Sequence, residues 1–107
     1  MNDVEKQIKY AKGRVLVAGY GEGLVQKYLL ENPKVSYVLT LEKNAQVIEE
    51  CKKVGKIHGL VSIIDFYDFM PGEKFDTIIG SLWEYDKFRA KAFYLLNPNG
   101  QILGFGQ

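Results

Sequence analysis

The chain has little of two residue types that often carry catalysis or hold metals. Its 107 residues include one cysteine, Cys51, and one histidine, His58. A single cysteine excludes a disulfide within the chain and is typical of a reducing, cytoplasmic compartment. One histidine and one cysteine cannot form a zinc site without several carboxylates, so we expect no metal centre. We interpret Cys51 as a core residue, because Val47 and Ile48 share its face of a predicted helix. We interpret His58 as a surface residue, because it lies between Lys56 and Gly59.

Net charge and long apolar runs are also lacking. The formal net charge is +1, which argues against a strong electrostatic site for nucleic acid or for a membrane surface. The segment 1–13 mixes acidic and basic residues without an apolar run, so we expect neither a signal peptide nor a membrane span there. No internal repeat or linker divides the sequence, and its 47% hydrophobic content predicts a single domain over residues 1–107.

The most informative segment that is present is 14–30, which reads RVLVAGYGEGLVQKYLL. An apolar run leads into Gly19, Gly21 and Gly23, and an amphipathic stretch follows them. A buried strand, a glycine-rich turn and a helix together present a helix N-terminus to a nucleotide-like ligand in parallel α/β sheets. A tight turn that binds nothing has the same pattern, so these glycines alone do not decide between the two interpretations.

Strand and helix patterns alternate along the rest of the chain. Apolar runs predict strands at 14–19, 35–41, 60–64, 75–81 and 101–105. Helical spacing predicts helices at 3–12, 22–31, from the N-cap Asn44 to Gly55, and 84–96, with a turn at 97–100. We therefore expect a three-layer α/β domain with a five-stranded parallel sheet and helices on both faces, and we assign it the strand order 3-2-1-4-5. With that order, the short link 66–74 must cross three strand spacings, so it must be mostly extended, with at most one helical turn.

Taken together, five segments resemble the core motifs of the class I S-adenosylmethionine-dependent methyltransferases, which have a Rossmann-like fold. VLVAGYGEG resembles the first motif of that family, and VLTLEKN, with Glu42 at the strand end, resembles the second. SIIDFYDF, with Asp65, resembles the third, and KFDTIIGS resembles the fourth strand. YLLNPNGQILGFG is similar to the usual approach to the fifth strand. The resemblance covers the whole chain, with the motifs in the family order.

The resemblance implies S-adenosylmethionine as the cofactor and a role for each motif. Backbone N–H groups of the glycine turn would receive the carboxylate of the cofactor. Glu42 would accept hydrogen bonds from the ribose hydroxyls, and Asp65 would accept one from the adenine amine while Phe66 packs on the ring. Gly80 and Ser81 would flank the methionine end. The implied cofactor-binding residues are Gly19, Tyr20, Gly21, Gly23, Glu42, Lys43, Asp65, Phe66, Gly80 and Ser81.

The part of the site that would hold a methyl acceptor has a weaker signal. Glu84, Tyr85 and Asp86 follow the fourth predicted strand and are the candidate catalytic residues, although a solvated first helical turn explains them equally well. Asp76 begins that strand, far from the expected site, and we interpret it as structural. Val17 stands where the family usually has an acid, and the chain ends where the family usually adds a helix and two antiparallel strands.

Three functions remain open at this point. The first is a small methyltransferase acting on a small molecule or on a group presented by a partner. The second is a non-catalytic cofactor-binding or regulatory subunit, and the third is an NAD-type dinucleotide-binding domain. Leu24 argues against the third, because it occupies the position of a third glycine in the dinucleotide fingerprint. The uncharged strand 101–105 is predicted at the sheet edge, so we expect a homodimer or a protein partner there, unless the chain's own ends cover it.

Overall fold

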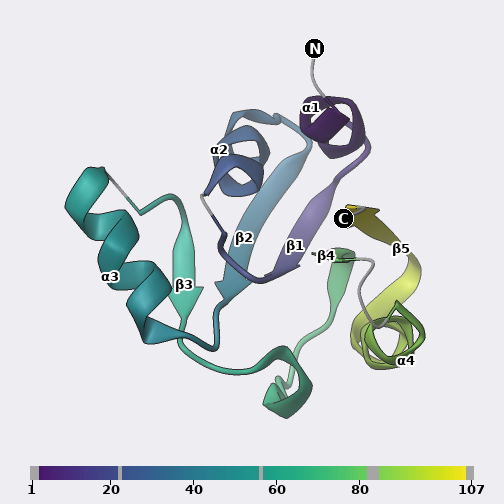
Figure 1. The fold of residues 1–107 in the computed structure, drawn as a ribbon. Coiled ribbons are helices and arrows are strands. Elements are labelled where there is room, and N and C mark those ends of the chain that lie inside the picture. Colours follow the sequence, from purple (N-terminus) through teal and green to yellow (C-terminus); the bar gives the residue numbers. More distant parts are fainter. Residues whose placement is uncertain (1–2, 22, 56, 82–84, 106–107) are drawn as a thin grey trace.

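The computed structural model describes residues 3–21, 23–55, 57–81 and 85–105, with backbone only at residues 3, 4, 81, 85 and 105 (Figure 1). Its five strands are β1 (Gly13–Ala18), β2 (Val35–Leu41), β3 (Leu60–Ser62), β4 (Phe75–Ser81) and β5 (Leu96–Phe105). Its helices are α1 (Asp3–Ile8), α2 (Leu24–Glu31), α3 (Ala45–Val54) and α4 (Tyr85–Leu95), with a 3-10 helix at Phe66–Asp68. All strand pairs are parallel and their order is β3-β2-β1-β4-β5, which confirms the predicted fold.

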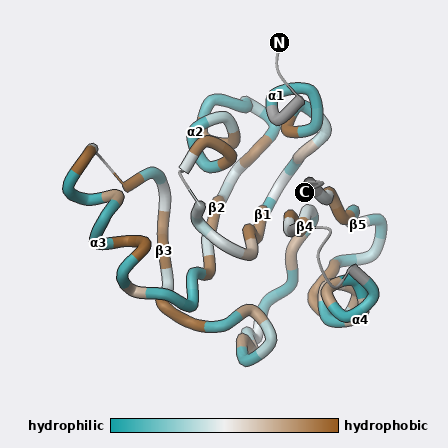
Figure 2. The backbone as a smooth tube through the Cα atoms, in the orientation of Figure 1, coloured by the Kyte–Doolittle hydropathy of each residue, from teal (hydrophilic) through white to brown (hydrophobic). Residues whose placement is uncertain are grey.

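Two hydrophobic cores lie on opposite faces of this sheet. Successive residues of a strand point to opposite faces, so Leu16 joins one core while Val15 and Val17 join the other. Side chains from α4 and the 3-10 helix cover the first core, and side chains from α1 and α2 cover the second. Figure 2 shows hydrophilic residues along the outer sides of the helices and hydrophobic residues recurring along the strands. The prediction of helices on both faces is therefore confirmed.

The connection between β3 and β4 contains a single helical turn, as its length predicts. Asp65 caps this 3-10 helix, because its Oδ1 accepts a hydrogen bond from the Tyr67 N–H at 2.9 Å. The prediction that β3 extends to Ile64 is wrong, since this strand ends at Ser62. The chain leaves the sheet there to reach the capped turn, and this places Asp65 and Phe66 beyond the carboxyl end of β2.

Two helices are shorter than the sequence pattern predicts. The first ends at Ile8 and not at residue 12, because Asn32 Nδ2 donates to the carbonyls of Ile8 (3.0 Å) and Ala11 (3.2 Å). These bonds supply partners for carbonyls at the end of the helix and draw the chain toward α2. The second begins at Leu24 and not at residue 22, because Gly23 has a left-handed backbone (φ 84°). The predicted cap of α3 is confirmed, since Asn44 accepts from the Gln46 N–H.

The segment 97–100, predicted as a turn before the fifth strand, lies inside β5. Phe75 pairs with Leu96 and Thr77 with Gln101, so β5 bulges between these two pairs. Asp76 holds the bulge: its Oδ1 accepts from Asn97 Nδ2 at 3.1 Å, and its Oδ2 accepts from the Arg14 N–H at 2.8 Å. The Arg14 bond, followed by the Asn97 bond, keeps the pKa of Asp76 below its ordinary value. The structural interpretation of Asp76 is therefore confirmed.

Candidate functional site

A pocket of about 340 Å³ opens at the carboxyl ends of β1 and β2, beside the 3-10 helix. Its lining is Ala18, Gly19, Leu41, Glu42, Lys43, Asp65, Phe66, Tyr67 and Phe88. Two larger pockets, of about 410 and 420 Å³, lie toward the amino ends of the strands and are lined by none of the predicted site residues. Parallel α/β sheets bind ligands at the carboxyl ends of their strands, so the smaller pocket is the candidate site.

The glycine turn between β1 and α2 forms one side of this site. Gly19 and Gly21 have positive φ angles of 103° and 58°, and a Cβ on either would meet open space. Gly19 also donates its N–H to the Leu41 carbonyl at 2.7 Å, which joins the turn to the end of β2. Gly23 gives α2 no side-chain cap, and the first turn of α2 contains no acidic residue. The positive end of this helix is therefore suited to an anionic ligand group.

Glu42 occupies the end of β2 and is only 9% exposed. Its Oε1 accepts from the Tyr20 N–H and its Oε2 from the Asn44 N–H, both at 2.9 Å. One carboxylate thus joins the glycine turn to the start of α3, a structural role that its position after an apolar strand does not reveal. Each carboxylate oxygen can accept a second hydrogen bond, so Glu42 retains acceptor capacity for a ligand in the pocket it lines.

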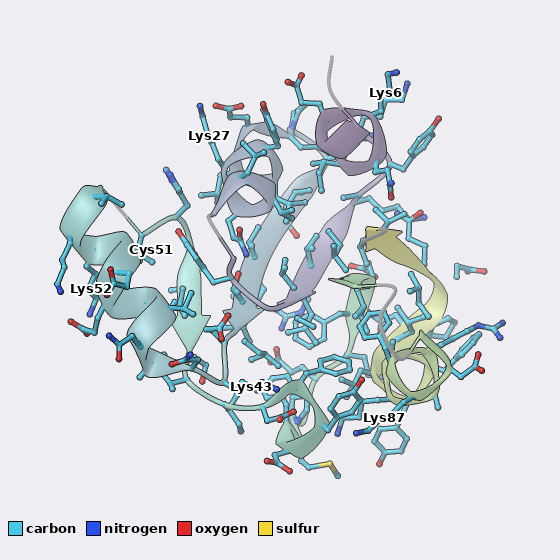
Figure 3. The ribbon with its side chains drawn as sticks, in the orientation of Figure 1. Lys6, Lys27, Lys43, Cys51, Lys52 and Lys87 are labelled. Carbon is cyan, nitrogen blue, oxygen red and sulfur yellow. The ribbon has the colours of Figure 1, made fainter. Side chains whose placement is uncertain are left out.

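Asp65 and Phe66 supply the opposite side of the pocket. Oδ1 of Asp65 is used by the 3-10 helix, whereas its Oδ2 has no hydrogen bond to any residue that the structure describes. The ring of Phe66 lies 5.3 Å from that of Tyr67, edge-on, and 5.2 Å from that of Phe88. Lys87 Nζ lies 4.2 Å from the centre of the Tyr67 ring (Figure 3). A free carboxylate oxygen beside an aromatic wall suits a flat ligand that carries a hydrogen-bond donor.

Four of the predicted cofactor residues, Tyr20, Gly21, Gly23 and Gly80, do not line the pocket. Tyr20 is buried, its hydroxyl accepts from the His58 N–H at 2.9 Å, and a Cβ on Gly23 would come within 2.8 Å of that hydroxyl. The Tyr20 ring therefore supports the glycine turn from within. Gly80 packs under Phe88, whose ring a Cβ would overlap. The side chain of Ser81 is among those the structure does not describe.

Only one of the three predicted catalytic residues, Asp86, has a described side chain, and it does not line the pocket. Glu84 lies outside the described residues, and Tyr85 is described by its backbone alone at the start of α4. Asp86 is exposed in the first turn of α4 and is absent from the pocket lining. Within the described ranges, no group of three or more His, Cys, Asp or Glu residues could hold a metal ion. None of the helices that the structure describes is long and apolar enough to cross a membrane.

Two buried polar residues beside the site were missed by the sequence analysis. Gln26 and Thr40 are completely buried, and Gln26 Nε2 donates to Thr40 Oγ1 at 3.1 Å and to the Gly19 carbonyl at 3.4 Å. The sequence signal that could have identified them is a polar residue inside an amphipathic helix pattern, for Gln26, and one inside an apolar strand, for Thr40. Cys51, interpreted as a core residue, is only half-buried, and its Sγ lies 3.6 Å from the Gly21 carbonyl (Figure 3).

Comparison with known proteins gives similarity to solved structures only. No family model and no curated protein matches the sequence. The DhpI–SAH complex has a TM-score of 0.72 at 20% identity, over 94% of this chain and 50% of that chain. An S-adenosylmethionine-dependent methyltransferase from Mesorhizobium loti has a TM-score of 0.71 at 19% identity, over 94% and 50%. The N-methyltransferase NodS from Bradyrhizobium japonicum WM9 has a TM-score of 0.70 at 18% identity, over 94% and 62%. This chain therefore spans between half and two thirds of the length of these three structures, and the likeness concerns the fold.

Proposed function

We propose that this chain, which has the fold of the class I S-adenosylmethionine-dependent methyltransferases, binds S-adenosylmethionine at the pocket described above and forms the cofactor-binding part of a methyltransferase. One observation supports the proposal: Gly19 of the glycine turn, Glu42 and Asp65 with Phe66 line a single pocket. These three groups would bind, respectively, the carboxylate, the ribose hydroxyls and the adenine of S-adenosylmethionine.

Each group contributes a different interaction to this binding. The N-terminus of α2, which has no acidic residue in its first turn, would receive the methionine carboxylate. The remaining lone pairs of Glu42 would accept from the ribose hydroxyls. The free Oδ2 of Asp65 would accept from the adenine amine while Phe66 contacts the ring. When bound, the cofactor supplies a methyl group on a sulfonium, which an acceptor's lone pair takes by in-line displacement.

A second candidate is a subunit that binds the cofactor without performing the transfer. It is supported by Val17, which is buried in the core between the sheet and α1–α2 at the position where the resemblance implies an acid. It is also supported by Asp86, which is exposed and outside the pocket lining. Methyl-transfer assays with candidate small molecules or partner proteins separate this candidate from the first.

Isothermal titration calorimetry with four ligands tests the cofactor. We expect S-adenosylmethionine and its demethylated product to bind, and decarboxylated S-adenosylmethionine to bind more weakly because it lacks the carboxylate that α2 would receive. NAD should give no heat. Tighter binding of NAD than of S-adenosylmethionine, or no heat from protein shown to be folded by circular dichroism, would refute the proposal.

We also propose that the protein acts in the cytoplasm as a homodimer joined through β5. The lone cysteine supports the reducing compartment. β5 is at the edge of the sheet, and the whole strand carries no charged residue. The backbone groups on its outer edge can pair with another strand, and a second β5 would place no like charges opposite each other.

A further inference from the structure

Gln26 is a polar side chain with no contact with solvent at the start of α2. It is 0% exposed and lies three residues beyond Gly23, the N-cap of the helix. A glutamine at this position often accepts a hydrogen bond from the N-cap N–H. Here the Gly23 N–H donates instead to the Tyr20 carbonyl at 3.0 Å, and Gln26 Oε1 has no hydrogen-bond partner among the residues that the structure describes. An apolar residue of the same length would avoid this unpaired acceptor, so local helix stability does not explain the glutamine.

The side chain of Gln26 makes its hydrogen bonds through its amide nitrogen. Nε2 donates to the Gly19 carbonyl at 3.4 Å and to Thr40 Oγ1 at 3.1 Å. Thr40 is itself completely buried and precedes Glu42 by two residues on β2. A single amide group therefore connects α2, the first glycine of the turn and the end of the strand that carries Glu42.

The Gly19 carbonyl and the Tyr20 N–H belong to the same peptide group. Gln26 holds the carbonyl of this peptide, and Glu42 Oε1 holds its N–H at 2.9 Å. With both ends held, the peptide cannot rotate without breaking a buried hydrogen bond. The Tyr20 N–H is also one of the two backbone donors that hold the Glu42 carboxylate. The orientation of this peptide therefore helps to fix where the carboxylate lies.

We propose that Gln26 is a positioning residue that, together with Glu42, clamps the Gly19–Tyr20 peptide and so sets the geometry of the ligand-binding turn. The identity of the ligand rests on the proposed function, whereas the clamp itself does not. Gln26 does not line the pocket, so it would not contact a ligand bound there. Its effect on affinity acts through the orientation of the turn and of the Glu42 carboxylate.

Gln26→Met tests the clamp, because methionine matches the length of glutamine and cannot donate a hydrogen bond. We expect the unfolding free energy to change little, because removing the unpaired Oε1 offsets the loss of the donor to the Gly19 carbonyl and to Thr40 Oγ1. Amide hydrogen exchange at Tyr20 should accelerate in the ligand-free protein, and the Kd for S-adenosylmethionine should rise about fivefold. If the role of Gln26 were purely structural, the variant would lose stability and affinity together.

Thr77→Val is the matched control. Thr77 is also completely buried and bonds the backbone of Lys12, but it lies on β4 toward the amino end of the sheet. We expect it to lower stability and to leave both Tyr20 exchange and the Kd unchanged.

The two readouts separate the clamp from the proposed function. Unchanged Tyr20 exchange in Gln26→Met, with stability and affinity falling together, would overturn the clamp. If the wild-type protein does not bind S-adenosylmethionine, the proposed function fails, and Tyr20 exchange still decides whether Gln26 holds the peptide.

Discussion

Replacing Glu42 separates its structural role from its role in ligand binding. Each of its oxygens accepts one backbone N–H at 2.9 Å, and the residue is 9% exposed. Glu42→Ala leaves both N–H groups without their acceptor, at about 1–3 kcal/mol for each buried group. Water entering the space left by the side chain recovers part of this, so we expect a loss of about 2–4 kcal/mol in unfolding free energy.

The same substitution removes the acceptor proposed for the ribose hydroxyls. Charge-assisted hydrogen bonds contribute about 1.5–3 kcal/mol, so the Kd for S-adenosylmethionine should rise about 10- to 150-fold. Glu42→Gln keeps one acceptor oxygen and should lose less stability than Glu42→Ala, while still losing the charge.

Urea denaturation measures the stability term, and calorimetric titration of protein verified as folded measures the affinity term. Glu50→Ala is the control, because Glu50 is an exposed acid on α3 and its removal changes the net charge equally. An unchanged Kd in folded Glu42→Ala would show that the carboxylate does not contact the ligand. Unchanged unfolding free energy would show that its two backbone hydrogen bonds do not stabilise the fold.

Three further predictions concern other parts of the molecule. The lowered pKa of Asp76 means that its stabilising effect is complete above the ordinary value of 3.8 and is lost as the pH falls through the folded-state value. Urea unfolding at pH 6 and pH 3 should therefore show a smaller pH dependence for Asp76→Asn than for the wild type, and equal dependence would contradict this. In Gly80→Ala the new methyl overlaps the Phe88 ring, so thermal unfolding should reveal a loss of about 1–3 kcal/mol, and no loss would show that α4 adjusts freely. Leu103→Lys adds a charge to β5 and should weaken the dimer in sedimentation equilibrium while circular dichroism shows a folded chain; a wild type that is monomeric at all micromolar concentrations excludes the dimer.

The strands of this fold were predictable because burial on both faces leaves a continuous apolar signature. The bounds of β2 and β4 match the apolar runs of the sequence, and the alternation of strand and helix patterns indicated the parallel sheet. The bulge at 97–100 was not predictable, because it depends on Asp76 reaching Asn97 from a neighbouring strand. Local sequence carries no record of such a contact.

The site was predictable where a residue type and a strand end coincide, as at Glu42 and Asp65. Both line the pocket, but their hydrogen bonds to the backbone of the turns were not foreseen. Tyr20 was predicted as a ligand contact from its place between glycines, and only the fold shows its ring packed inside. Gln26 was missed because a buried polar residue resembles a surface residue until its partners across the fold are known.

The pairing of β1 with β4 at the centre of the sheet affects how the chain folds during synthesis. Arg14 and Asp76, which join these strands, are separated by 62 positions, so the central pairing has a large sequence separation. Contacts of this kind slow folding, because a long loop must close before they form. A nascent chain that has not yet reached β4 already contains the glycine turn and Glu42, but it lacks the strand beside β1 and the helix whose Phe88 completes the pocket wall. We therefore expect the pocket to be complete only after α4 has left the ribosome.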